Sequence, residues 1–178
     1  MAKSAIGIKK LYYGSVITAT THLSTSGVGV LISSSTEITN VHQDTWELAE
    51  DDATQETYKN QLTKAVYRTG SKEMGDITVN FTVGQYDYAT KAALLGGSVI
   101  KESNTDVGWA RGRGAIQLTK SLIAITEDNV AVVFPKVEFI SSEAATDGAI
   151  GIKMSAKVME PEQTYISSEY WFDYTPSL

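Results

Sequence analysis

The feature that most constrains the fold of this chain is a regular alternation of apolar and polar residues in its second half. Between residues 77 and 83 the apolar side chains occupy the odd positions, from Ile77 to Val83, and the polar ones occupy the even positions. Residues 149–158 alternate in the same way. A period of two is typical of a β-strand with one face buried and the other wet. Long strands with polar Thr, Ser, Asn and Lys faces indicate a protein that provides a surface or builds an assembly.

Residues 115–126 and 130–141 are expected to form an antiparallel pair of strands. Glu127-Asp128-Asn129 lies between them, and Asn tolerates the left-handed conformation that such turns demand. The apolar positions change phase midway along each strand, and Pro135 sits at the second change. Because proline lacks an N–H donor, we expect a bulge or an edge position there.

One short helix is predicted between these strand regions. Asp87 is placed to cap it, residues 88–95 form it, and Gly96-Gly97 close it. A helix of this length needs packing against a sheet to persist.

The first third of the chain and its C-terminal end are less regular. The Ser/Gly/Val-rich residues 24–35 are expected to form a loop or a flexible hairpin. An aromatic cluster, 170–174, is expected to pack either on the domain or on a neighbouring molecule. The remaining expectations are strands at 9–17 and 36–48, a polar and acidic connection at 47–56, and an extended segment at 58–69.

Length and composition narrow the class of protein. A chain of 178 residues suits a single domain, and 42% hydrophobic residues are too many for a disordered one. It has no cysteine, which excludes disulfides and thiolate metal sites. The first ten residues lack the apolar stretch of a signal peptide, and the longest apolar run, 130–134, is far too short to span a membrane. We therefore expect a soluble product of the cytosol with no membrane insertion.

The net charge of −6 argues against tight nucleic-acid binding, which needs clustered Lys and Arg. The one basic, Gly-rich stretch is 108–114, whose Trp and Arg side chains could stack on a base or hold an anion. The favoured interpretation is structural: a loop before a strand, with Trp109 buried and the arginines paired with carboxylates.

No catalytic or cofactor-binding constellation is recognisable. His22 and His42 have no spacing that indicates a shared metal, and neither a Gly-x-Ser-x-Gly elbow nor a phosphate-binding loop occurs. The acids between 47 and 56 lack the calcium-loop pattern and any sugar-stacking groove. They are interpreted either as a solvated loop or as a surface that pairs with Lys and Arg of another subunit. No enzyme activity, metal or cofactor is expected.

The order of elements and several local strings resemble the major tail tube proteins of tailed bacteriophages. The strings that carry the resemblance are Lys9-Lys10-Leu11-Tyr12-Tyr13-Gly14, Thr45-Trp46-Glu47, Tyr58-Lys59-Asn60-Gln61-Leu62, the strand–helix–Gly-Gly block 77–97, 121–126, Val133-Phe134-Pro135-Lys136 and 150–159. Residues 24–35 and the aromatic tail match nothing in that family. The similarity covers most of the chain, but it consists of strand and turn patterns.

This resemblance implies a β-sandwich or barrel of antiparallel strands flanked by one short α-helix. It implies a single tail-tube-like domain over 1–178, with a long loop around 44–59 and a C-terminal arm over 161–178. The family's function is structural: six copies close a ring, and rings stack into a tube through which DNA leaves the capsid. Needle tubes of contractile injection systems share the fold.

The resemblance also implies partners and a location. The partners are other copies of the chain, the tape measure protein and the tail terminator, and DNA passes without specific binding. The location is the virion tail, after a stage in the host cytoplasm. The residues expected to contact other subunits are Trp46, Glu47, Glu50, Asp51, Asp52, Glu56, Tyr58, Trp171 and Phe172.

Two physical arguments point the same way. Exposed strand edges promote aggregation unless they are paired, and closing them around a ring removes that hazard. Six copies at −6 each carry a formal charge of about −36, and charge of that sign near a lumen would repel phosphate. The alternative function is a carbohydrate- or ligand-binding β-sandwich, for which nine tyrosines and three tryptophans could supply a binding platform.

Overall fold

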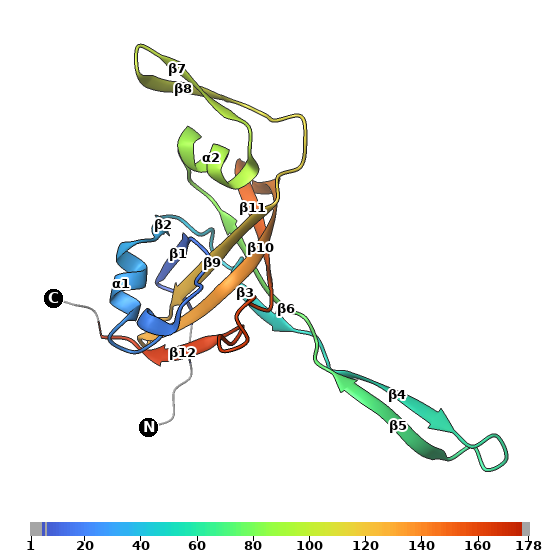
Figure 1. The fold of residues 1–178 in the computed structure, drawn as a ribbon. Coiled ribbons are helices and arrows are strands. Elements are labelled where there is room, and N and C mark those ends of the chain that lie inside the picture. Colours follow the sequence, from blue (N-terminus) through green and yellow to red (C-terminus); the bar gives the residue numbers. More distant parts are fainter. Residues whose placement is uncertain (1–4, 6, 176–178) are drawn as a thin grey trace.

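The computed structural model describes residue 5 and residues 7–175. The fold is mainly β, as the alternation predicts, and consists of one curved eight-stranded antiparallel sheet and two separate hairpins (Figure 1). The sheet has the order β2-β1-β9-β10-β11-β6-β3, and β12 pairs with β10. Its strands are β1 (Lys10–Gly14), β2 (Thr36–Ile38), β3 (Glu47–Glu50), β6 (Ile77–Val83), β9 (Leu118–Ile125), β10 (Val130–Thr146), β11 (Ala149–Val158) and β12 (Tyr170–Asp173).

The two hairpins and the helices complete the fold. The hairpins project from the sheet in different directions (Figure 1). They are β4 (Thr54–Lys59) with β5 (Val66–Glu73), and β7 (Ser98–Glu102) with β8 (Thr105–Ala110). The helices are α1 (Val28–Ser33), α2 (Tyr88–Leu95) and the 3-10 turn η1 (Thr20–His22). Within the described residues, no helix is long and apolar enough to cross a membrane.

The sheet closes into a barrel because one segment pairs with both of its ends. β2 pairs with β1, and β3 pairs with β6 at the opposite end of the sheet. Between them, Val41 forms a bridge with Val83, and the backbone N–H of His42 donates to the carbonyl of Thr82 over 2.7 Å. The single strand predicted over 36–48 is therefore two strands, β2 and β3. They pair with β1 and β6 and are separated by the segment that connects the two ends of the sheet.

The predicted bulge at Pro135 is confirmed. The register between β9 and β10 shifts between Phe134 and Val137. On the other edge of β10, residues 130–133 pair with β12 and residues 137–146 pair with β11, so these two strands follow one another along that edge. Asn129, in the turn before β10, has φ 61°, the left-handed conformation expected there.

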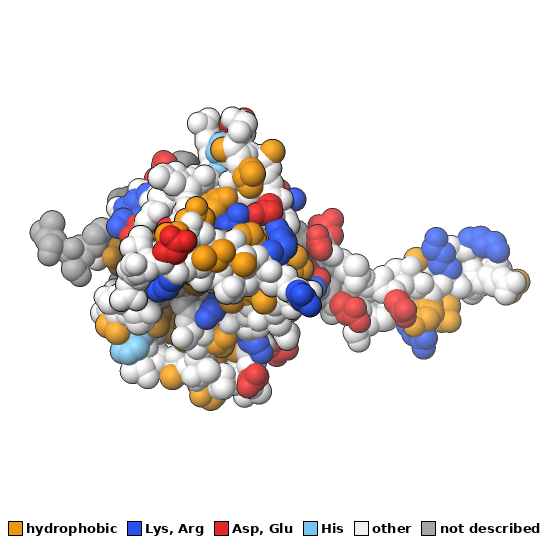
Figure 2. All heavy atoms as spheres, turned by 90° about the horizontal axis from the view of Figure 1, so that it is seen from above, with side chains coloured by type: hydrophobic (Ala, Val, Ile, Leu, Met, Phe, Trp, Pro, Cys, Tyr) orange, Lys and Arg blue, Asp and Glu red, His pale blue; other side chains and the backbone are white. Residues whose placement is uncertain are grey.

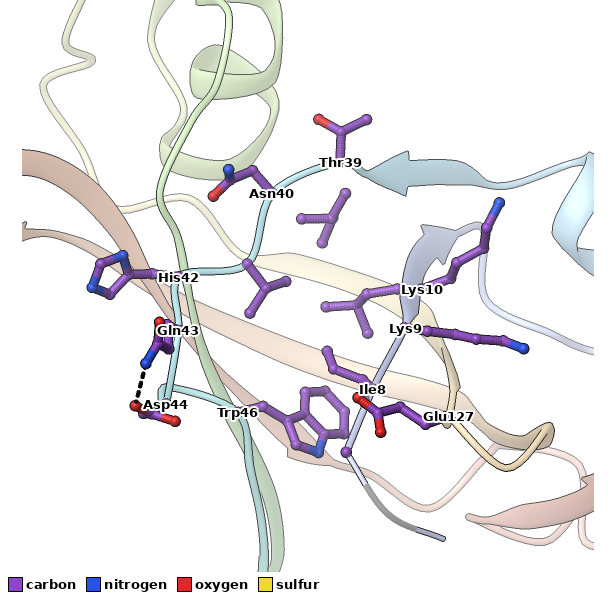
Figure 3. Close-up of a pocket in the computed structure, with 14 residues that line it drawn as sticks. Ile8, Lys9, Lys10, Thr39, Asn40, His42, Gln43, Asp44, Trp46 and Glu127 are labelled. Atoms are coloured by element: carbon purple, nitrogen blue, oxygen red, sulfur yellow. Dashed lines mark hydrogen bonds between the residues drawn. The ribbon is translucent and has the colours of Figure 1, made fainter.

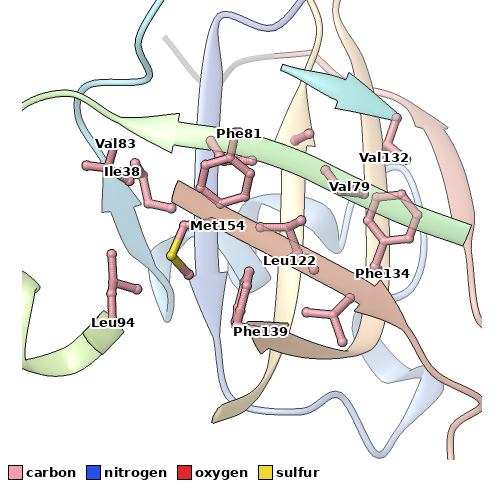
Figure 4. Packing of buried hydrophobic residues seen from close by; sticks show 14 of the residues in the cluster. Ile38, Val79, Phe81, Val83, Leu94, Leu122, Val132, Phe134, Phe139 and Met154 are labelled. Carbon is pink, nitrogen blue, oxygen red and sulfur yellow. The ribbon is translucent and has the colours of Figure 1, made fainter. Parts of the chain in front are cut away.

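The central strands bury side chains on both faces. In β9, Leu122 and Ala124 point into the barrel, whereas Ile123 and Ile125 point to its outer face. Figure 4 shows the inner cluster between β6 and β11 on one side and β1, β9 and β10 on the other. Phe81 and Phe139 meet edge to face there, with ring centroids 6.4 Å apart. The outer cluster lies under α1 and β12.

The structure has a second helix where a loop or flexible hairpin was expected. Within residues 24–35, α1 forms and buries Val28 completely in the outer cluster. Ser24 starts the turn, because its hydroxyl accepts from the Gly27 N–H over 3.1 Å. A six-residue helix is unstable alone, so burial of its apolar side chains against the barrel stabilises it. The residues that pack there, Val28, Leu31 and Ile32, have the i, i+3, i+4 spacing of a helix, but the run is short and is flanked by Ser and Gly residues.

The aromatic C-terminal cluster packs on the chain's own barrel. Tyr170 and Phe172 of β12 stack with centroids 5.8 Å apart and pack against the outer cluster. Trp171 alternates to the other side and is 50% exposed. Within the predicted C-terminal arm, 161–178, residues 170–173 therefore lie along β10, and residues 176–178 lie outside the described residues.

Candidate assembly surface

The β4–β5 hairpin, residues 54–73 and hereafter the arm, continues the β3–β6 pair out of the barrel. Glu50 opposes Ile77 at the end of β3, and Thr54 opposes Glu73 at the start of β4. Between these pairs the ladder is interrupted, and the N–H of Asp51 donates to the carbonyl of Asp76 over 3.0 Å. The segment expected to be a long loop, 44–59, instead contains β3 of the barrel and β4, which forms with β5 a ribbon that leaves the body of the molecule (Figure 1).

A glycine sits where the arm leaves the barrel. A Cβ on Gly75 would overlap the carbonyl carbon and oxygen of Asp51. Any other residue would push the neighbouring backbone segment at Asp51 away from residue 75. The direction of the arm therefore depends on Gly75.

The tip of the arm is an ordered turn. The side-chain oxygen of Asn60 accepts from the N–H groups of Leu62 and Thr63 over 2.8 and 3.3 Å. The backbone of Asn60 also exchanges hydrogen bonds of 2.8 Å with Ala65 and Lys64. This side-chain-to-backbone bonding is typical of Asn-initiated turns. It holds Leu62 at the tip with 91% of its surface exposed.

Almost the whole arm is exposed to solvent. All six residues of β4 and all but one residue of β5 are exposed. The exposed side chains include Tyr67 at 67% and, next to the arm, Met74 at 83%. An isolated two-stranded ribbon is at best marginally stable in water, and exposed apolar groups of this kind mark interaction sites. The barrel therefore leaves the apolar side chains of the arm uncovered.

Acidic side chains gather where the arm leaves the barrel and basic ones toward its far end (Figure 2), except that Lys72 lies in the root half, opposite Gln55. The basic tip consists of Lys59, Lys64 and Arg68, and no Asp or Glu occurs between positions 57 and 72. Arg68 lies 4.2 Å from the centre of the Tyr58 ring, a cation–π contact. Among the described residues, Lys59 and Lys64 take part in no ion pair. The acidic root consists of Glu50, Asp51, Asp52, Glu56 and Glu73.

The root half of the arm also carries an open groove of about 680 Å³. Its carboxylates are those of Glu56 and Glu73, and Glu56 accepts a hydrogen bond from the Tyr58 hydroxyl over 2.8 Å. Gly70 keeps the space open, because a Cβ there would lie 3.3 Å from the Cβ of Glu56. The groove is lined by Thr54, Gln55, Glu56, Tyr58, Gly70, Ser71 and Glu73.

A second groove, of about 590 Å³, opens at the mouth of the barrel (Figure 3). Trp46 lies across its floor and packs near Phe81, with centroids 6.4 Å apart. Lys10 on its rim pairs with Glu37 over 3.7 Å. The imidazole of His42 points away from the groove and lies 3.2 Å from Asp147. No pair of acids or imidazoles converges on this space.

The described residues hold no group of three or more His, Cys, Asp or Glu side chains that could bind a metal ion. His22 lies in η1 and His42 follows β2, and the structure does not bring the two together.

The favoured interpretation of the basic, Gly-rich stretch holds for Arg111, whereas Arg113 is exposed and takes part in no ion pair among the described residues. Arg111 and Lys91 both pair with Glu143, over 2.6 and 2.7 Å. Trp109 is half-buried, donates its indole N–H to the Gly96 carbonyl over 2.8 Å, and lies under the Lys91 ammonium. It belongs to strand β8 and not to a loop. This cluster attaches α2 and the β7–β8 hairpin to β10.

The charges of this cluster stabilise one another. The hydrogen bond from Lys91 lowers the pKa of Glu143, and Arg111 lowers it further. The same bond to Glu143 raises the pKa of Lys91. The stabilisation is therefore present near neutral pH. It is lost as the pH falls through the lowered pKa of Glu143 or rises through the raised pKa of Lys91.

The predicted contact residues fall in three places. Glu47 and Glu50 lie on β3, and Asp51, Asp52, Glu56 and Tyr58 lie on the root half of the arm or beside it. Trp46 lies in the mouth of the barrel, and Trp171 and Phe172 lie on β12. Sequence reasoning missed the basic tip and Leu62, because residues 58–69 were expected to run straight through. The Asn60 turn was the signal that could have revealed the tip.

No protein-family model matches the chain, and no curated protein matches it either. The resemblance to tail tube proteins thus depends on local strings and on the order of elements alone. The function is therefore argued from the geometry of the arm and the barrel.

Proposed function

We propose that this chain is a structural subunit that assembles through its arm into hexameric rings, which stack into a phage tail tube that conducts DNA. The arm carries this proposal. It is a ribbon of 20 residues, 54–73, whose strands pair only with each other. Ordering a backbone costs about 1–2 kcal/mol per residue. A ribbon that buries almost nothing in its own molecule recovers that cost by packing against another.

The barrel supports a role as a wall. Its inner cluster is filled by its own side chains, and the mouth groove presents no converging catalytic groups. The outer face of β6 and β11 carries polar side chains, with Asn80 directly opposite Ser155 and Lys153 and Lys157 on either side. Asp76 pairs with Lys157 and offsets one of these two positive charges. The net charge of −6 adds a weak repulsion for phosphate.

The ring of six and the stacking come from the resemblance to tail tube proteins. The physical requirement is more general. A head-to-tail contact produces a closed ring when its rotation closes and a filament when it repeats along an axis. An arm that leaves the barrel on one side provides such a contact, since its root and its tip present different surfaces.

The experiment compares the full chain with an armless variant in which residues 54–73 are replaced by Asn-Gly, a two-residue turn that joins paired strands. Negative-stain microscopy of the concentrated full chain should show rings or hollow filaments. The armless variant should remain monomeric, with an unchanged circular dichroism spectrum apart from the lost ribbon. Rings of equal number and size from both proteins would refute a role of the arm in assembly. A full chain that stays monomeric at every concentration and salt tested would refute the proposed function.

The alternative, a carbohydrate- or ligand-binding module, is favoured by the mouth groove with Trp46 on its floor. Aromatic rings in open grooves are common in sugar sites. Its test is binding of the purified chain to a glycan array, with Trp46→Ala as the matched control. Binding that the substitution abolishes, together with a monomeric protein, would replace the tube proposal.

A further inference from the structure

We propose that the basic tip of one copy's arm docks in the acidic groove on the arm of a second copy, so that arms join head to tail. The inference rests on the proposed self-assembly and specifies its contact. The partner is a second copy of this chain, and the recognition combines charge pairing with burial of an apolar tip.

The docking surface is the groove on the root half of the arm. It offers about 680 Å³ of open space between the carboxylates of Glu56 and Glu73. The ring of Tyr58 also forms part of its lining, but Arg68 of the same arm already lies over that ring, so the two carboxylates provide the charge recognition. Asp51 and Asp52 lie between β3 and β4, where the arm leaves the barrel, and add negative charge beside the groove.

The docking element is the tip, which is ordered before it binds. The hydrogen bonds of Asn60 hold the turn, so little conformational entropy remains to be lost on docking. Leu62 projects from it with Lys59 and Lys64 nearby in the chain, and neither ammonium has an ion-pair partner among the described residues. An apolar group surrounded by free cations fits an open groove with carboxylates on its walls.

The contact must join two molecules. The tip, 60–65, and the groove belong to the same paired ribbon, which cannot fold back onto itself without losing its ladder. An acidic polymer such as nucleic acid would match the tip, but it would leave the acidic groove of the same arm unused. A second arm matches both surfaces at once. A docked pair still presents one free tip and one free groove, so the contact can propagate.

The first test uses charge reversal and mixing. The tip-reversed variant carries Lys59→Glu and Lys64→Glu, and the groove-reversed variant carries Glu56→Lys and Glu73→Lys. Each variant presents the same sign at both surfaces, so self-association measured by sedimentation velocity should fall about tenfold or more. An equimolar mixture should recover association, because every tip then meets a groove of opposite sign. A single chain with all four substitutions should recover it as well.

The matched control is Arg113→Glu with Lys153→Glu, which changes the net charge as much as the tip-reversed variant does, at exposed positions outside the arm. It should associate like the unmodified chain. The docking is wrong if either reversed variant associates as strongly as the unmodified chain. It is also wrong if reversed variants that melt at the unmodified temperature fail to recover on mixing.

The second test uses the absence of cysteine from the chain. A Leu62→Cys protein mixed with a Ser71→Cys protein should form an intermolecular disulfide within minutes of adding a mild oxidant. Thr119→Cys replaces Ser71→Cys in the control mixture and should give no comparable product. Equal cross-linking in both mixtures would overturn the docking.

The two proposals fail separately. Association that follows the arm charges without rings or tubes in the microscope would retain the docking and refute the tube function. Tubes built equally well by both reversed variants would refute the docking and leave the tube function standing.

Discussion

The same pair of chain segments runs from the barrel into the arm, but the barrel buries many of their side chains and the arm exposes nearly all of them. In the barrel, β6 buries Val79, Phe81 and Val83 in the inner cluster. A few residues farther out, the same two segments form β4 and β5, where nearly every side chain is exposed. Folding of the chain buries one part of this ribbon and leaves the other part exposed, and we propose that association with a second copy stabilises the exposed part.

The largest expected effect lies in the barrel. Phe134 is fully buried, and Phe134→Ala should reduce the free energy of unfolding by about 3–5 kcal/mol through lost burial and a cavity. Urea denaturation measures the change. A loss below about 1 kcal/mol would mean that the core is not packed as described.

A smaller effect is expected where the β7–β8 hairpin joins the body. Trp109→Phe removes the indole N–H that bonds to the Gly96 carbonyl, and it should cost about 1 kcal/mol. Hydrogen exchange in β7 and β8 should accelerate, while exchange in β9 stays unchanged. Uniform acceleration throughout the barrel would show that the cluster supports the whole fold and not the hairpin alone.

The cap of α2 gives a comparable effect with a defined pH dependence. The Thr90 N–H donates to Asp87 and lowers the pKa of its carboxyl group. The stabilisation is complete above the ordinary carboxyl pKa and is lost as the pH falls through the lowered value. Asp87→Ala should thus cost about 1 kcal/mol at neutral pH. The difference from the unmodified chain should shrink in unfolding curves recorded below about pH 4. A difference that stays constant down to pH 2 would contradict this assignment.

The smallest effect on stability is expected in the arm. Leu62→Ser with Tyr67→Ser should change the free energy of unfolding by less than about 0.5 kcal/mol, because neither side chain is buried. The same variant should lose most of its self-association in sedimentation velocity. A variant with a destabilised monomer and normal self-association would show that these side chains stabilise the fold and not the contact between copies.

The sequence predicts the barrel better than the arm for a physical reason. Burial on one face imposes the alternation of 77–83 and 149–158, and the missing donor of Pro135 marks its bulge. β4 is exposed on both faces, so its sequence, Thr-Gln-Glu-Thr-Tyr-Lys, shows no such pattern. The helix α1 was missed because the helical spacing of Val28, Leu31 and Ile32 is confined to six residues among Ser and Gly, and packing against the barrel is needed to stabilise so short a helix.

The candidate surface was predicted in part. The acids from Glu47 to Glu56 were recognised as a surface that could pair with Lys or Arg of another subunit. The basic group that matches them, at the other end of the same arm, could not be inferred without the turn at Asn60. The acidic and basic clusters are close together in the sequence, and only knowledge of the turn at Asn60 shows that they lie at different ends of the arm.

Hydrogen–deuterium exchange of the full chain below and above its assembly concentration tests the central claim most directly. The account predicts that amides of 54–73 exchange rapidly in the dilute protein and become protected when copies associate, while amides of β9 and β10 are protected throughout. Assemblies in which 54–73 exchanges as rapidly as in the monomer would contradict it.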